Sequence, residues 1–209
     1  MDRVKIKNEA KKIIEGNLWN ILKPMIIIMV ISSLAGGLAQ YIFNPETVLG
    51  TLCNTLVTVA LLPLEYGLLV FILKFTRHEK VDYDEVFKYY NKFVPIFLLG
   101  LLTSIFIGLW SLLFVIPGII ASLSYSQSMY IMIDGEEEPK KCIDKSKQMM
   151  YGYKWDYFTF MFSFIGWYLL CVVTLGIALV YVTPYVSVAQ ALYYEELKKV
   201  LQFSQEIDK

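Results

Sequence analysis

Long apolar stretches alternate with short polar segments along the whole chain. Six apolar stretches of 15 to 26 residues can be read from the sequence, at 24–43, 48–73, 93–116, 119–133, 157–173 and 177–194. About 20 apolar residues in a helix cross the ~30 Å hydrocarbon core of a bilayer. Backbone polar groups inside lipid must bond within their own segment, which favours helices. The pattern therefore predicts an all-α membrane protein with six transmembrane helices arranged as three hairpins.

A Pro-Gly pair divides the longest apolar region. A single helix over 93–133 would contain 41 residues and would be ~60 Å long, which is too long for a bilayer. We therefore expect the chain to turn at Pro117-Gly118 and to return. The segment Phe106–Ile120, FIGLWSLLFVIPGII, recurs as FIGWYLLCVVTLGI at Phe164–Ile177 with an offset of 58 residues. Each copy predicts a helix, a tight uncharged turn and the start of a returning helix.

The polar segments carry all 19 lysine and arginine residues of the chain, and the turns inside the three hairpins carry none. These segments are 2–23, 74–92, 134–156 and the tail from 195. In the first three, apolar residues at helical spacing predict a basic amphipathic helix that lies at the membrane interface before each hairpin. With six spans all the cations fall on one side, which the positive-inside rule makes cytoplasmic. We therefore expect a plasma-membrane protein with both termini in the cytoplasm.

Each interfacial helix and its hairpin form one unit of a single integral membrane domain. The units are residues 1–73, 74–133 and 134–209, and the visible repeat relates the second unit to the third. Small residues four apart in the first two units predict faces for close helix packing in lipid. These residues are Ser32-Ser33 with Gly36-Gly37, and Gly100 with Ser104 and Gly108.

Composition and motifs argue against several classes of function. Hydrophobic residues make up 56% of the chain and charged residues 18%, with a formal net charge of zero, so no overall positive field recruits nucleic acid. The three cysteines are far apart and lack metal-ligand spacing. No Walker loop, HExxH or GxSxG motif is present, and the one histidine, His78, lies in a charged loop. We therefore predict no enzyme activity, no cofactor and no metal.

Glu65 is the strongest candidate for a functional residue, because it is the only ionisable side chain deep inside an expected span. A charge inside the bilayer is costly and marks function by default. Gln127 and Tyr130 on the fourth span, and Tyr185 and Gln190 on the sixth, could line a polar cavity with it. The alternative is structural: Glu65 only packs helices, and the other four form ordinary interhelical hydrogen bonds.

Several motifs resemble those of a known family. They are LWSLLFVIPGII, YSQSMYIMID, KSKQMMYGYKW, SFIGW, TLGI and, near the N-terminus, AKKIIEGNLW. Together they are similar to the integral membrane family of Firmicutes called domain-of-unknown-function family 975. Glu65 belongs to no part of that pattern. The resemblance implies a bacterial plasma-membrane protein with no established biochemical activity.

Two kinds of function fit these observations. The first is a non-enzymatic scaffold or accessory protein, which binds anionic lipid headgroups through its basic helices or associates with a partner membrane protein. The second is a small permease with a polar path around Glu65. The basic helices also fit simple anchoring by the positive-inside rule, which requires no specific ligand.

Overall fold

The computed structural model describes residues 1–43 and 46–207, with side chains up to Gln202. The turn expected at 44–46 lies partly outside these residues, and Lys209 lies wholly outside them. Helices account for all regular structure in the described part of the chain, so the predicted all-α class is confirmed. The elements are α1 (Arg3–Glu15), α2 (Leu18–Ile42), α3 (Val48–Thr76), the 3-10 helix η1 (Tyr83–Lys92), α4 (Phe93–Leu113), α5 (Val115–Tyr125), α6 (Ser128–Ile133), α7 (Pro139–Met149), α8 (Lys154–Phe162), α9 (Ile165–Val173) and α10 (Leu179–Ile207).

Four helical segments are long and apolar enough to cross a membrane, namely Leu18–Ile42, Val48–Thr76, Tyr83–Leu113 and Lys154–Val173. They correspond to the first, second, third and fifth spans expected from the sequence. The fourth expected span is divided at Ser126 and Gln127 into α5 and α6, which have only 11 and 6 residues. The sixth lies in α10, where polar side chains such as Gln190 dilute the apolar ones. A membrane protein with several spans is thus supported, and the count of six stays a prediction.

The turn inside the repeated segment lies three residues before its expected position. Phe114, with φ −160° and ψ 155°, is extended and separates α4 from α5. Pro117 falls in the first turn of α5, where its missing N–H costs no hydrogen bond. Helix α5 then packs closely on α4, because a Cβ on Gly118 would lie 2.1 Å from Ser111 Oγ. The chain therefore does reverse here, and the Pro-Gly pair begins the returning helix.

The second copy of the repeat turns where the sequence predicted, at 174–176. Leu175 and Gly176 both have positive φ values, 50° and 90°. The Gly176 amide donates to the Cys171 carbonyl at 2.8 Å, which caps α9. Phe164, however, lies at the break between α8 and α9, whereas its counterpart Phe106 lies inside α4. The two copies share a hairpin-like ending but differ in where their first helix begins.

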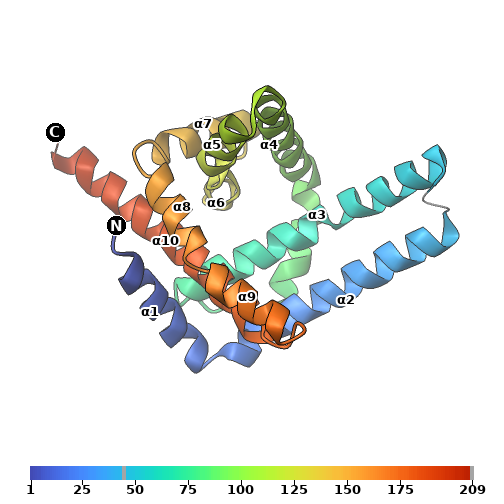
Figure 1. The fold of residues 1–209 in the computed structure, drawn as a ribbon, viewed down its shortest axis with the longest axis horizontal. Coiled ribbons are helices and arrows are strands. Elements are labelled where there is room, and N and C mark those ends of the chain that lie inside the picture. Colours follow the sequence, from blue (N-terminus) through green and yellow to red (C-terminus); the bar gives the residue numbers. More distant parts are fainter. Residues whose placement is uncertain (44–45, 208–209) are drawn as a thin grey trace.

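The core is formed around α10, which runs beside α1 and α8 in the left part of Figure 1. Its residues Val188, Ala189, Ala191, Tyr193 and Leu197 are completely buried. Figure 1 shows α2 and α3 side by side and extending away from this core, while α4 and α5 extend in another direction. The two helix pairs therefore extend in different directions from the core. The reason lies in the distribution of contacts, because the buried residues of α3 are concentrated in its second half, from Pro63 onward.

The first expected interfacial helix differs from the prediction in length and in surroundings. It was predicted over residues 2–23, but α1 ends at Glu15 and α2 begins at Leu18. Its apolar face, formed by Ile6, Ala10, Ile13 and Ile14, is buried in the core cluster that also contains residues of α10. This face is therefore covered by protein, and the lysines of α1 occupy the sides that remain accessible.

Candidate functional site

The four basic segments lie together in the fold. Arg3 of the first segment forms an ion pair with Asp156 of the third at 3.4 Å. Lys92 of the second contacts Glu137 of the third at 2.8 Å. The tail joins them through α10, which is described below. The charge pattern predicted that these segments lie on one side of the membrane, and ion pairs bring the same segments into contact.

Five residues from three distant segments form a cluster that we call the charged junction: Arg77, Asp134, Tyr194, Glu195 and Lys198. Arg77 Nη2 lies 2.7 Å from Asp134 Oδ1 and 2.6 Å from Glu195 Oε1. Lys198 Nζ donates to Asp134 Oδ2 at 2.5 Å, and the Tyr194 hydroxyl donates to the same oxygen at 2.8 Å. The junction therefore ties the C-terminal ends of α3 and α6 to α10.

Both central groups of the junction are held in their charged forms. Burial by itself would raise the pKa of Asp134, but hydrogen bonds from Lys198, Arg77 and Tyr194 outweigh it and keep that pKa below its usual range. Burial also opposes the charge on Arg77, but its hydrogen bonds to Asp134 and Glu195 raise the pKa of the guanidinium. Partly sheltered charges attract one another more strongly than charges in bulk water. The junction is thus suited to holding α3, α6 and α10 in fixed positions relative to one another.

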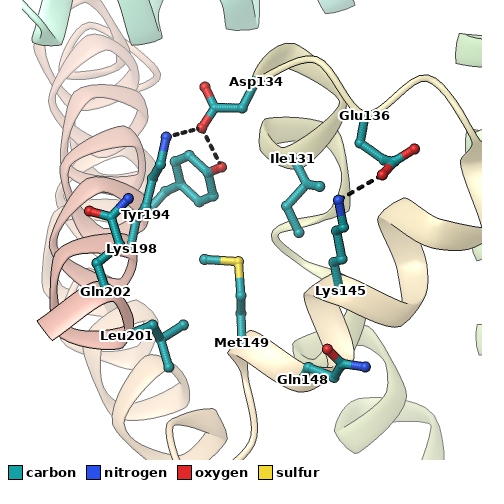
Figure 2. A pocket seen from close by; sticks show the side chains of 10 residues that line it. All are labelled: Ile131, Asp134, Glu136, Lys145, Gln148, Met149, Tyr194, Lys198, Leu201 and Gln202. Atoms are coloured by element: carbon teal, nitrogen blue, oxygen red, sulfur yellow. Dashed lines mark hydrogen bonds and ion pairs between the residues drawn. The ribbon is translucent and has the colours of Figure 1, made fainter. Parts of the chain in front are cut away.

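A pocket of about 510 Å³ opens beside the junction, between α6–α7 and α10. Figure 2 shows two ion pairs at its edges, Asp134 with Lys198 and Glu136 with Lys145. Apolar side chains line the space between them, together with two glutamines: Ile131, Met149, Leu201, Gln148 and Gln202. Because two carboxylates face two ammonium groups, the lining favours neither a cation nor an anion.

A second charged cluster fixes η1 to α3. Glu85 Oε1 lies 2.7 Å from Lys74 Nζ, and the Tyr89 hydroxyl donates to the same oxygen at 2.7 Å. Lys88 contacts the other carboxylate oxygen at 3.0 Å. The hydrogen bonds from Lys74 and Tyr89 lower the pKa of Glu85 to about 2. Gly67 completes the attachment, because a Cβ there would lie 2.1 Å from the Val86 carbonyl oxygen.

Glu65 is exposed on the surface of α3, although its neighbours Leu64 and Tyr66 are buried. It lies on the same face as three exposed threonines at helical spacing, Thr51, Thr55 and Thr58. The hydroxyls of Thr55 and Thr58 donate to carbonyls one turn earlier, at 2.9 and 3.0 Å. We call these four residues the α3 polar stripe: Thr51, Thr55, Thr58 and Glu65. The stripe runs along a helix that is long and apolar enough to cross a membrane.

The other four candidates are packed among neighbouring side chains. The Gln127 backbone N–H donates to Ser146 Oγ at 3.1 Å, and the Tyr130 ring stacks on Tyr194 with centroids 5.0 Å apart. Tyr185 is buried against Phe164 and Trp167, and Gln190 Nε2 lies 3.5 Å from Met161 Sδ. Four pockets in the described part of the chain have linings that include neither these four residues nor Glu65.

The charged junction was not predicted from the sequence. Each of its charged residues lies at or just beyond the polar end of an apolar stretch. That position was the available signal, because charges at the ends of packed helices often meet. Among the described residues, no group of three or more His, Cys, Asp and Glu side chains could hold a metal ion.

Comparison with known families gives one match. A family model described as protein of unknown function (DUF975) matches residues 1–121 and 112–200. The two matched ranges cover most of the chain, so the expected resemblance to this family is confirmed. No curated protein and no solved structure matches this chain.

Proposed function

The chain belongs to the DUF975 family of proteins of unknown function, and we propose that it is a non-enzymatic membrane scaffold. It spans the plasma membrane of a bacterial cell six times, with both termini in the cytoplasm. Its basic end associates with anionic lipid headgroups, and its span-length helices associate with a partner membrane protein. The observation that carries this proposal is the α3 polar stripe, which is exposed on a helix of membrane-spanning length.

An exposed carboxyl group on a lipid-facing helix is unfavourable. Charged residues inside membrane spans almost always face a protein interior or pair with an opposite charge. Glu65 forms no ion pair among the described residues. We infer that a helix of another membrane protein covers the stripe and supplies a lysine or arginine, or another hydrogen-bond donor, at the depth of Glu65.

Small residues on the neighbouring helices support the same conclusion. Their spacing predicted close helix packing, yet a Cβ on Gly36, Gly37, Gly100 or Gly108 would meet no atom within 4 Å. Ser33 and Ser104 on the same helices are exposed. These faces are therefore unused within one chain, and small residues in lipid allow the close approach of a second helix.

The permease alternative needs a path that contains Glu65 and the polar residues of α5, α6 and α10. Glu65 is exposed on the outer surface, whereas Gln127, Tyr130 and Tyr185 are buried in packed surroundings. We therefore favour the scaffold over the permease.

The test uses a defined partner. A polyleucine transmembrane peptide with one central lysine, and the same peptide with leucine there, would be reconstituted with the protein in liposomes. Energy transfer between labels would measure association. We expect the lysine peptide to associate at least about threefold more tightly, since interhelical hydrogen bonds contribute ~0.6 to ~1.7 kcal/mol.

A variant pair assigns that association to Glu65. Glu65→Leu should abolish the preference for the lysine peptide. Glu79→Gln removes a carboxylate from the polar loop after α3 and should leave the preference for the lysine peptide unchanged. Equal preference in the wild type and in Glu65→Leu would refute the role of Glu65. Substrate flux that depends on Glu65 would favour the permease instead.

A further inference from the structure

We propose that Lys7 and Lys11 of α1, positioned by Ser163 and Trp167 across from them, bind the phosphate group of a phosphate ester. This inference rests on the proposed association with anionic headgroups, and it gives that association one specific site. We call these four residues the α1 phosphate site.

The two lysines point at the break between α8 and α9. Lys7 Nζ donates to Ser163 Oγ at 3.0 Å and lies 5.1 Å from the centre of the Phe164 ring. Lys11 Nζ lies 5.7 Å from the centre of the Trp167 ring. Contacts with a hydroxyl and with aromatic faces hold both ammonium groups in place without neutralising them.

Neither lysine has a carboxylate partner within ion-pair distance in the described part of the chain. Some other lysines, such as Lys5 and Lys12, also lack an ion pair, but these two are exposed, whereas Lys7 and Lys11 are half-buried. Lys7 and Lys11 are four residues apart on one helix, where like charges repel each other. The pKa of Lys7 is lowered by burial and by the charge of Lys11. Two unneutralised lysines one helical turn apart therefore favour an anion that can contact both.

The surface beside the lysines favours the phosphate of a membrane lipid. Ser163 lies at the break between α8 and α9, and Trp167 lies in the first turn of α9. The next turns of α9 expose the apolar side chains of Ile165, Tyr168 and Leu169. Acyl chains can pack along this surface while the phosphate contacts the lysines, as at other basic sites beside membrane helices. A soluble phosphate ester shares the same headgroup chemistry but gains nothing from the apolar surface.

The experiment measures lipid that stays bound to the full-length protein. The protein would be reconstituted in nanodiscs of phosphatidylcholine with one fifth phosphatidylglycerol, released into detergent, and analysed by native mass spectrometry. We expect the wild type to retain phosphatidylglycerol in preference to phosphatidylcholine. The double variant Lys7→Gln/Lys11→Gln should lower this retention at least fivefold.

Matched variants separate the site from general charge. Lys5→Gln/Lys12→Gln removes the same charge from the same helix at two exposed positions and should keep retention within twofold of the wild type. Lys7→Arg/Lys11→Arg keeps the charge and should retain the lipid, which tests the site even if the glutamine variant fails to fold. Equal losses in the two glutamine variants, or loss in the arginine variant when it is folded, would overturn the proposal.

A competition arm identifies the source of the phosphate. Millimolar glycerol phosphate or inorganic phosphate should leave the bound phosphatidylglycerol in place if the site is a lipid site. Displacement would support the phosphate site but assign it to a soluble ester. A wild type with no preference for phosphatidylglycerol would refute the site, while the lysine-peptide experiment on Glu65 would still decide whether the protein is a scaffold.

Discussion

Arg77 Nη2 lies 2.6 Å from Glu195 Oε1, although 118 residues separate the two in the chain. The same guanidinium also contacts Asp134. One side chain therefore connects the end of α3, the end of α6 and the polar part of α10. Since these ends lie at the polar boundaries of three expected spans, their contact restricts both the stability of the fold and the topology of the chain.

Replacing Arg77 with glutamine should destabilise the protein measurably. The change leaves Asp134 and Glu195 without their shared cation in a setting where the Arg77 side chain is only 25% exposed. Loss of hydrogen bonds to charged groups at such a site costs about 1 to 3 kcal/mol. We expect the thermal midpoint in detergent to fall by roughly 5 °C.

The control for Arg77 is Lys88→Gln. Lys88 also pairs with an acid, Glu85, but its side chain is 58% exposed, and exposed pairs contribute less than about 1 kcal/mol. The thermal midpoint of Lys88→Gln should differ from that of the wild type by little more than the error of the measurement. Similar shifts in the two variants would contradict the structural importance of the junction.

Much of this architecture was predictable from the sequence, and the rest depends on long-range contacts. The apolar stretches predicted α2, α3 and α4, and the uncharged repeat predicted the turn at 174–176. The charge pattern indicated that the basic segments lie together, but it could not pair Arg77 with Glu195, because that contact depends on how α3 and α10 pack. For the same reason the sequence could not show that Glu65 is exposed: α3 is apolar nearly all round, so its periodicity does not distinguish a buried face from an open one.

Glu85 should make stability depend on pH in acid. Its folded pKa is about 2, below the reference value of 4.5. A depressed carboxyl pKa stabilises the fold above the unfolded pKa, and this stabilisation is lost as the pH falls from about 4.5 toward 2. We expect Glu85→Gln to be less stable than the wild type at pH 6 and to approach it at pH 3.

The measurement for Glu85 is the difference in thermal midpoint between the two proteins at each pH. Asp134 and Glu136 also have lowered pKa values and titrate in both proteins, so their effects cancel in the difference. A difference that stays constant from pH 6 to pH 3 would show that Glu85 does not lose a favourable ionised state.

Gly67 should tolerate no larger side chain. A Cβ there would lie 2.1 Å from the Val86 carbonyl oxygen and 2.8 Å from the Val86 Cα, both of which belong to the backbone of η1. Gly67→Ala must therefore push η1 away from α3, at a cost of about 1 to 3 kcal/mol. Trypsin should then cleave faster after Lys88, which limited proteolysis can follow.

Gly100→Ala is the matched control for Gly67. Gly100 is also inside a long helix, but a Cβ there meets no atom within 4 Å. In the purified chain this change should be neutral or stabilising by up to about 1 kcal/mol, because alanine favours a helix over glycine. Equal sensitivity at the two positions would show that helix propensity, and not contact with η1, sets the effect.

Accessibility of two positions distinguishes six membrane spans from four. If only the four longest apolar segments cross the membrane, Lys147 lies outside the cell and Leu175 inside. With six spans these positions exchange sides. The charged junction favours six spans, because Asp134 and Arg77 can form their ion pair only on the same side of the membrane. The chain between α4 and Asp134 must then cross back through the membrane as α5 and α6. We expect a cysteine at 147 to be shielded from an impermeant maleimide in intact cells.

The complementary position should react from outside. Leu175 is 93% exposed at the tip of the α9 turn, so Leu175→Cys should be labelled in intact cells, in a background where Cys53, Cys142 and Cys171 are replaced by serine. His78→Cys is the control, because both topologies place it in the cytoplasm, and it should react only after the cells are opened. Labelling of Lys147→Cys but not of Leu175→Cys in intact cells would establish four spans. The junction could then not form across the bilayer, because Arg77 and Asp134 would lie on opposite sides of it.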